Sequence, residues 1–133
     1  MHWIGKHTLF KWPGGWLLRR LDGIPVDRRS KNNFVGSIVE LFKRYEQFVL
    51  VIAPEGTRNK SDHWKTGFYY IALGAGVPIA LGFVDYKKKI LGIGPCVHPS
   101  GDIQADFVQI QEFYKGITGK NPQLQGQMML RSE

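Results

Sequence analysis

The residues best suited to chemistry in this chain lie at positions 53–58, where the sequence is Ala-Pro-Glu-Gly-Thr-Arg. Gly56 lets backbone amides approach a ligand closely, Thr57 offers a hydroxyl, and Arg58 carries a planar guanidinium that can bind phosphate through two hydrogen bonds. Glu55 can orient an arginine or a substrate hydroxyl. These residue types suit an anionic ligand. A strand-ending turn with a surface Glu–Arg pair is the alternative interpretation of the same residues.

The segment before this motif predicts where the motif sits. Residues 48–53 form a continuous run of apolar side chains, rich in β-branched residues. A strand that is apolar on both faces is typical of the centre of an α/β sheet. In such sheets ligands bind outside the carboxyl ends of the strands. We therefore expect 48–53 to be a buried central strand that delivers the motif to a binding site.

The rest of the chain alternates helix and strand patterns. Helices are expected over 12–21, 34–46, 65–75 and 103–117, and strands over 24–26, 48–53, 78–84 and 88–93. Asn33 is expected to cap the second helix, whose apolar stripe is Phe34, Ile38, Leu41, Phe42 and Tyr45. This order predicts an α/β fold with a mixed, largely parallel sheet flanked by helices. At 133 residues the chain has the length of a single domain, 1–133, with a loose tail over about 119–133.

The net positive charge of the chain favours anionic ligands. The formal net charge is +7, and basic residues crowd the first third of the chain. Such a field attracts nucleic acid, an anionic membrane surface or phosphorylated small molecules, and charge alone does not separate them. No Cys/His cluster has zinc spacing, so no metal site is expected. Cys96 is expected to be a small buried core residue.

No segment of the sequence predicts a signal peptide or a membrane span. The longest apolar tract, 71–84, is interrupted by three glycines and a proline and is shorter than the roughly 20 residues that a span needs. We expect a soluble or peripheral protein.

Three ordered blocks of the sequence resemble the glycerol-phosphate and lysophosphatidate acyltransferase family. Pro-Glu-Gly-Thr-Arg at 54–58 looks like its hallmark block. The stretch 23–28, Gly-Ile-Pro-Val-Asp-Arg, resembles its second block, and 77–81, Val-Pro-Ile-Ala-Leu, resembles its fourth. Order and separations agree with the family, and the resemblance covers about residues 1–100.

The resemblance implies roles for individual residues. Arg28 and Arg58 would hold the phosphate of the acceptor, Glu55 and Gly56 would shape its pocket, and Thr57 would support the loop. Lys65 resembles the basic residue that often opens the family's next helix, where helix amides would add donors for an anion. A solvated helix residue is the alternative for Lys65.

The activity implied is transfer of a fatty acyl group from a thioester, acyl-CoA or acyl carrier protein, to a glycerol-phosphate or lysophospholipid hydroxyl in phospholipid biosynthesis. No bound cofactor or metal is expected. The acceptor, the acyl-chain length and the type of donor stay open.

One block of the family is missing from this sequence. The family's His-x-x-x-x-Asp, whose histidine acts as the general base, does not occur. No catalytic residue is therefore identified, and we expect the chain to be N-terminally incomplete and weakly active or inactive by itself. His7 and His63 are the only substitutes, and exposed loop positions are the simpler interpretation of both. A noncatalytic lipid- or phosphate-binding remnant of the same fold is the alternative function.

Aromatic and basic residues interleave near the N-terminus. Trp3, Phe10, Trp12 and Trp16 stand among lysines and arginines, as at the interface of an anionic bilayer. The alternative is that the tryptophans pack under N-terminal helices that we expect this chain to lack. Together with the lipid acceptor, this pattern predicts a cytoplasmic protein that is peripherally attached to the inner face of the membrane. Nucleic acid is not expected as a partner, because no nucleic-acid-binding motif accompanies the charge.

Overall fold

The computed structural model divides into two compact units, Met1–Ile52 and Ala53–Glu133. It describes residues 3–6, 11, 14–20, 23–26, 31–56, 61–122 and 125–130. The expectation of a single domain stays a prediction.

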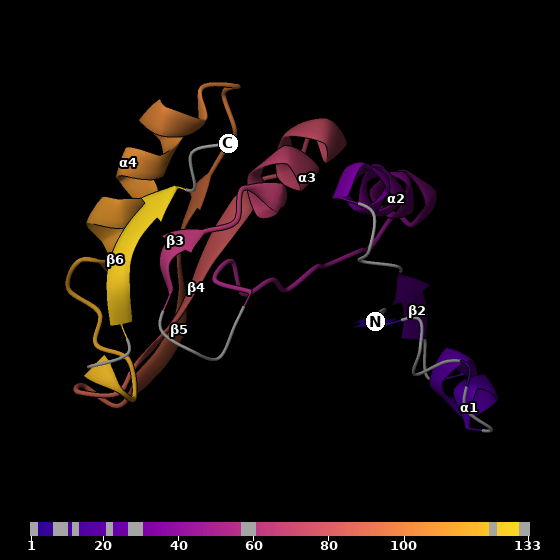
Figure 1. Ribbon diagram of the computed structural model, residues 1–133, viewed down its shortest axis with the longest axis horizontal. Coiled ribbons are helices and arrows are strands. Elements are labelled where there is room, and N and C mark those ends of the chain that lie inside the picture. The colour runs from indigo at the N-terminus through magenta and orange to yellow at the C-terminus, as the bar shows by residue number, and fades with distance from the viewer. Residues whose placement is uncertain are drawn as a thin grey trace. The chain divides into compact units, whose positions relative to one another are not determined.

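The first unit contains a parallel strand pair and two helices (Figure 1). Strand β1 (Trp3–Lys6) pairs with β2 (Gly23–Val26), and between them in sequence lies helix α1 (Gly15–Arg20). Helix α2 (Lys31–Arg44) follows. Within the described residues, the predicted helix at 12–21 and strand at 24–26 are therefore confirmed by α1 and β2.

Helix α2 carries the expected apolar stripe. Ile38 is fully buried, and the other stripe residues are half-buried. After the helix, the Phe48 ring packs edge-on against Phe42, with ring centroids 4.8 Å apart. The prediction that Asn33 caps this helix is wrong, because α2 already begins at Lys31 and Asn33 lies within it.

The predicted central strand at 48–53 does not form. These residues belong to no strand, and Val49 and Val51 are 66% and 87% exposed. A strand buried on both faces needs a hydrogen-bonding neighbour on each side and packed layers above and below it. Every sheet in the described part of the chain has only two strands, and none of them pairs with this segment. The apolar run therefore lies outside every described sheet, with Phe48 and Leu50 half-buried and the other side chains exposed.

The second unit holds the remaining elements, again as small sheets and helices. They are β3 (Ser61–Trp64), α3 (Gly67–Ala75), β4 (Ile79–Asp85), β5 (Ile90–Val97), α4 (Ile103–Tyr114) and β6 (Gln125–Leu130). β4 and β5 form an antiparallel hairpin, whereas β3 pairs with β6 in parallel. The expected helices at 65–75 and 103–117 and strands at 78–84 and 88–93 are present. Helices and small sheets with parallel and antiparallel strands are compatible with the predicted α/β fold. The described residues form three two-stranded sheets, and the mixed, largely parallel sheet stays a prediction.

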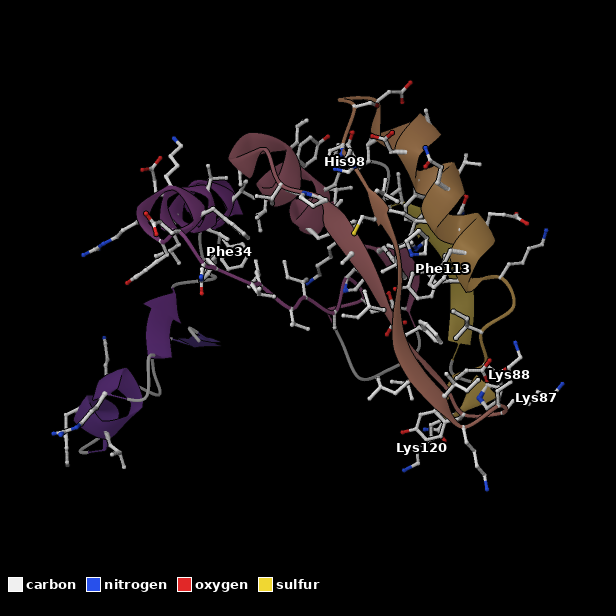
Figure 2. All side chains as sticks on the ribbon, turned by 180° about the vertical axis from the view of Figure 1, so that it is seen from behind. Phe34, Lys87, Lys88, His98, Phe113 and Lys120 are labelled. Atoms are coloured by element: carbon white, nitrogen blue, oxygen red, sulfur yellow. The ribbon has the colours of Figure 1, made fainter. Side chains whose placement is uncertain are left out.

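The core of this unit lies between the hairpin and α4. Leu81 and Val97 from the strands pack with Phe107 and Ile110 from the helix, and Trp64 of β3 adds edge-on contacts to neighbouring aromatic rings. Gly94 of β5 allows the Phe113 ring of α4 to approach the hairpin closely. A Cβ at Gly94 would overlap the Phe113 ring, which projects from α4 toward the hairpin (Figure 2).

Strand β6 corrects the expectation of a loose tail after residue 119. Residues 125–130 pair with β3, and Met128 and Leu130 pack against the core. The side-chain amide of Gln111 on α4 also donates to the carbonyl oxygen of Met128. This segment is thus held by backbone pairing, by apolar contact and by a side-chain hydrogen bond.

A buried carboxylate ties α3 to α4. Asp106, only 4% exposed, accepts hydrogen bonds from the Tyr69 hydroxyl and from the Ser100 amide, both at 2.7 Å. The Ser100 hydroxyl donates to the same carboxylate, and the Tyr69 oxygen accepts from the Gly101 amide at 3.0 Å. These bonds, led by that from the Ser100 amide, lower the pKa of Asp106. Burial, and next the Asp106 carboxylate, raise the pKa of Tyr69. We call this group of Tyr69, Ser100, Gly101 and Asp106 the Asp106 network.

The Asp106 network makes stability depend on pH. Because the folded-state pKa of Asp106 lies below its ordinary value of 3.8, the carboxylate stabilises the fold at every pH above that value. This contribution is lost as the pH falls through the lower folded-state pKa. We expect Asp106→Asn to lower the Tm at pH 7 by roughly 5–10 °C, and to flatten the decline of Tm between pH 5 and pH 2. Circular dichroism melts across this range measure both effects.

Asp102→Asn is the matched control. This substitution also removes one negative charge near the start of α4. The Asp102 side chain caps the helix by accepting from the amides of Gln104 and Ala105, and asparagine caps a helix equally well. The Tm of this variant should stay within a few degrees of that of the unsubstituted chain. Equal losses in the two variants would contradict a special role for Asp106.

Candidate functional site

The candidate site is built on the tight turn at the start of the second unit. The Gly56 amide donates to the carbonyl oxygen of Ala53 at 3.2 Å, which closes the turn. Gly56 has a φ of +65°, a conformation that costs other residues a steric clash between Cβ and the following carbonyl. The carbonyl oxygen of Pro54 accepts from the Lys65 amide at 2.9 Å. The turn is therefore tied to the residues that lead into α3.

Lys65 lies directly over this turn. A Cβ on Gly56 would be 2.9 Å from both Cε and Nζ of Lys65, so the end of the lysine side chain occupies the space that a side chain at position 56 would need. Both Lys65 and Glu55 are exposed. The arrangement places an accessible ammonium beside exposed backbone, where it can act as a point charge for an anion.

The start of α3 adds to the positive character of this region. Thr66 is the N-cap residue and its side chain makes no capping hydrogen bond, and no acidic residue occupies the first turn. The N-terminal amides of a helix carry a partial positive charge that favours anions. Lys65 and this helix end follow one another in the chain, so both contributions act at one place.

The structure places half of the predicted site residues. Glu55, Gly56 and Lys65 are described, and Gly56 and Lys65 are brought into contact. Arg28, Thr57 and Arg58 lie outside the described residues, so the predicted pair of arginines on one phosphate stays a prediction.

Of the two candidate bases, only His63 is described, and neither it nor His98, which was not a candidate, has a carboxylate partner among the described side chains. His63 is exposed on β3 and His98 is exposed after β5. Neither imidazole hydrogen-bonds to an aspartate or glutamate among the residues described, and His7 lies outside them. Over the same residues, no group of three or more His, Cys, Asp or Glu side chains could hold a metal ion. The expectation for Cys96 is wrong, because it is exposed.

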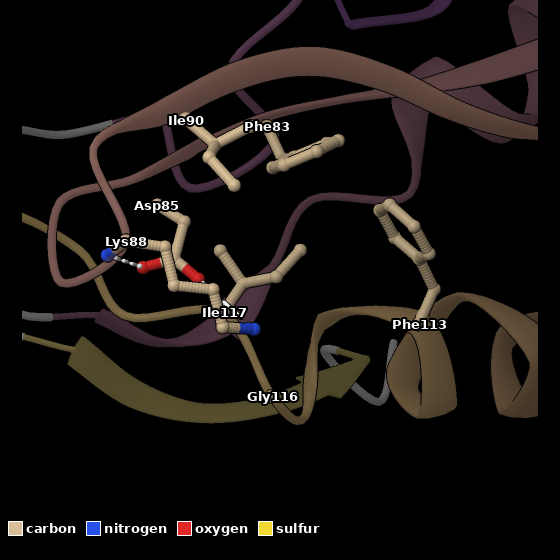
Figure 3. Close-up of a pocket in the computed structure, with 7 residues that line it drawn as sticks. All are labelled: Phe83, Asp85, Lys88, Ile90, Phe113, Gly116 and Ile117. Atoms are coloured by element: carbon tan, nitrogen blue, oxygen red, sulfur yellow. Dashed lines mark hydrogen bonds and ion pairs between the residues drawn. The ribbon is translucent and has the colours of Figure 1, made fainter.

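A second feature, an open cavity of about 270 Å³, was not anticipated from the sequence. Phe83 and Ile90 from the hairpin face Phe113 and Ile117 across it, and Asp85 and Lys88 lie at one end (Figure 3). The complete lining is Phe83, Asp85, Lys88, Ile90, Phe113, Gly116 and Ile117. An apolar hollow with an ammonium at its rim suits an apolar ligand group rather than a free phosphate. Its walls come from segments that are separated in sequence, so no local sequence pattern predicts the cavity.

The expected membrane-facing aromatics are only partly described. Trp16 on α1 is 66% exposed, whereas the side chain of Trp3 and residues Phe10 and Trp12 fall outside the described part. No helix among the described residues has the length and apolar character needed to cross a bilayer.

Comparison with known families decides what kind of domain this is. A family model described as Acyltransferase matches residues 1–80, which is more than half of the 133 residues. The chain belongs to the acyltransferase family. No curated protein and no solved structure matches it.

The matched region of this acyltransferase chain contains all the predicted site residues. The turn and Lys65 lie within residues 1–80, as does Arg28, whereas most of the hairpin, its cavity and α4 lie beyond them. The family relationship supports acyl transfer as the general chemistry.

The turn predicts a specific effect of substitution in this acyltransferase domain. Gly56→Ala should lower the free energy of unfolding by about 1–2 kcal/mol, because alanine at a φ of +65° meets the left-handed steric penalty. The added methyl should also displace the end of Lys65. Urea denaturation measures the first effect, and the chemical shift of the Lys65 side-chain amine measures the second.

Gly67→Ala provides the control for this prediction. Gly67 begins α3 in the same unit and lacks a positive φ, and a Cβ there would meet no atom within 4 Å. The substitution should leave stability unchanged or slightly higher, since alanine favours helices. If Gly56→Ala and Gly67→Ala changed the free energy of unfolding equally, the steric penalty that we assign to position 56 would be refuted.

Proposed function

We propose that this acyltransferase moves a fatty acyl group from an acyl thioester to the hydroxyl of a glycerol-phosphate or lysophospholipid acceptor. The family match over residues 1–80 supports the acyl transfer. The observation that supports a phosphorylated acceptor is the Lys65 ammonium lying over the Gly56 turn. A place in phospholipid biosynthesis, at the inner face of the membrane, is part of the same proposal.

The phosphate would be held by charge-assisted hydrogen bonds. Lys65 supplies a point charge beside the turn, the start of α3 supplies backbone amides, and Arg58 follows the turn by two residues. Arg28 would provide a second guanidinium. Each charge-assisted hydrogen bond contributes on the order of 1.5–3 kcal/mol, so two or three of them suffice to select a phosphorylated acceptor over glycerol.

The chemical step requires a base and no metal or covalent intermediate. The acceptor hydroxyl oxygen attacks the thioester carbonyl carbon, a C–O bond forms, and the proton of the hydroxyl must be removed. The tetrahedral oxyanion then collapses, the C–S bond breaks, and the thiolate leaves with a proton. A positioned general base accelerates such a step by roughly 10²- to 10⁴-fold.

A noncatalytic role is the second candidate, and one observation favours it. The printed sequence contains no His-x-x-x-x-Asp pair, and His63 has no carboxylate partner among the residues described. Such a remnant would bind phosphate or lipid without turnover. It would retain the turn and Lys65 and lack the general base.

Acceptor and donor affinities test the assignment of Arg58. We expect Arg58→Ala to raise the Kd for lysophosphatidate by about 10- to 100-fold, the loss of one charge-assisted contact. The Kd for oleoyl-coenzyme A should change by less than about twofold, because the residue serves the acceptor. Isothermal titration calorimetry with each ligand measures both values.

Arg44→Ala controls for the loss of one positive charge. Arg44 ends α2, where its guanidinium lies 5.9 Å from the centre of the Tyr45 ring, and its removal should leave both affinities unchanged. Equal weakening of acceptor and donor by Arg58→Ala would undermine its role. Rapid turnover that His63→Ala abolishes would show that our assignment of no catalytic base to this chain is wrong, and binding without any acylated product would favour the remnant.

A further inference from the structure

The outer face of the β4–β5 hairpin is apolar and exposed. Leu91 and Ile93 are 79% and 78% exposed, and Val84, which pairs with Leu91 across the hairpin, is about half exposed. The opposite face of the same strands carries Leu81 and Val97 into the core. A hairpin with one solvated face normally shows polar side chains there.

No charged side chain interrupts this outer face. Through the register, the residues that alternate outward are Ala80, Gly82 and Val84 on β4 and Leu91, Ile93 and Cys96 on β5. Both strands are described completely, and all six residues are exposed. Single exposed apolar residues are ordinary, but a contiguous apolar patch marks an interaction site.

The end of the hairpin is basic. Lys87, Lys88 and Lys89 follow Tyr86 through the turn, and all four are exposed. Lys87 and Lys88 project from this end of the hairpin (Figure 2). The Tyr86 amide donates to the carbonyl oxygen of Thr118 at 2.9 Å, which brings the segment with Lys120 to the same end.

The buried Asp85 fixes the turn and neutralises only part of this charge. Its carboxylate accepts from the amides of Lys87 and Lys88 at 3.0 Å, and the Lys88 ammonium lies 3.6 Å from it. Among the described residues no acidic side chain forms an ion pair with Lys87 or Lys89. Both side chains are exposed, so they can reach an external anion.

We propose that the β4–β5 hairpin docks on an anionic lipid surface. Its apolar outer face lies on the interfacial region of the bilayer, and Lys87, Lys89 and Lys120 bind lipid phosphates. Tyr86 lies between the apolar layer and the phosphates, as aromatic residues do at membrane interfaces. This site is on a different element from the aromatics near the N-terminus. It deepens the proposed attachment to the membrane by naming the element that makes the contact, and it does not rest on the proposed enzymatic activity.

Charge complementarity favours a lipid surface over a second copy of the chain. In a two-fold interface the same patch lies on both partners, so a second copy would bring more lysines and no exposed acidic group to this surface, and like charges oppose association. An anionic bilayer offers an apolar layer and a negative layer together, which matches the two parts of this surface.

Vesicle binding tests the proposal with paired variants. We expect the full chain to bind vesicles of equal parts phosphatidylcholine and phosphatidylglycerol, and to bind phosphatidylcholine alone much more weakly. Lys87→Gln/Lys89→Gln should reduce the partition coefficient on anionic vesicles by about 25-fold, from about fivefold for each lysine. Leu91→Thr/Ile93→Thr should reduce it by about tenfold or more, because it removes the inserted apolar area. Co-sedimentation measures both.

The charge-matched control is Lys43→Gln/Arg44→Gln. It removes two exposed positive charges from the end of α2 and should bind anionic vesicles as the unsubstituted chain does. The proposal is overturned if this control loses as much affinity as the hairpin variants, or if Trp16→Ser abolishes binding while both hairpin variants retain it. It is also overturned if the unsubstituted chain does not bind anionic vesicles, or if sedimentation velocity shows a dimer that Leu91→Thr/Ile93→Thr dissociates.

Cys96 offers a readout that does not depend on affinity. It is the only cysteine of the chain, it is exposed, and it lies on the outer face opposite Ala80. An environment-sensitive fluorophore on its sulfur should shift to the blue when anionic vesicles are added, and should not shift with the Lys87→Gln/Lys89→Gln variant at the same lipid concentration. An unchanged spectrum of the labelled chain bound to vesicles would show that another face makes the contact.

Discussion

The second unit depends on the buried carboxylate of Asp106. An ionised group that is removed from water is tolerated only when its hydrogen bonds are replaced, and here Tyr69 and Ser100 replace them at 2.7–3.0 Å. Tyr69 belongs to α3, Ser100 to the loop after β5, and Asp106 to α4. One carboxylate thus joins three segments, and the apolar packing of the hairpin on α4 completes the same core.

The candidate site follows from that anchored helix. Tyr69 sits in the first turn of α3, so fixing its hydroxyl fixes the start of the helix, and Lys65 leads directly into it. The Lys65 amide holds the turn at Pro54, and its side chain lies over Gly56. The turn lies within the residues that match the acyltransferase family, and the phosphate-binding role that we propose needs an accessible cation held at a backbone turn. The apolar cavity and the hairpin surface lie at other places in the unit and serve other contacts.

Local patterns predict the helices well because their signals are local. Ile38 in α2 and Phe107 and Ile110 in α4 recur with helical spacing, and each is buried. The apolar run at 48–53 is misleading because its pattern predicts a strand only where neighbouring strands exist to pair with it. Strand β6 and the Asp106 network escape prediction for a related reason, since β6 is defined by its pairing with β3, and Tyr69 and Asp106 are 37 residues apart. At the site, the structure places Lys65 over Gly56, whereas the part of both residues in binding a ligand stays a prediction. The cavity has no signal in the sequence because its walls meet only through tertiary packing.

The central claim is that the Gly56 turn and Lys65 bind the phosphate of the acceptor, and a titration of the ¹⁵N-labelled chain with glycerol 3-phosphate tests it most directly. We predict saturable shifts of the Gly56 and Lys65 amide signals with one common Kd, at least about tenfold weaker in Lys65→Gln, and no shifts with glycerol. If these two signals did not move, or moved equally with glycerol, the turn would not be a phosphate site and the claim would be contradicted.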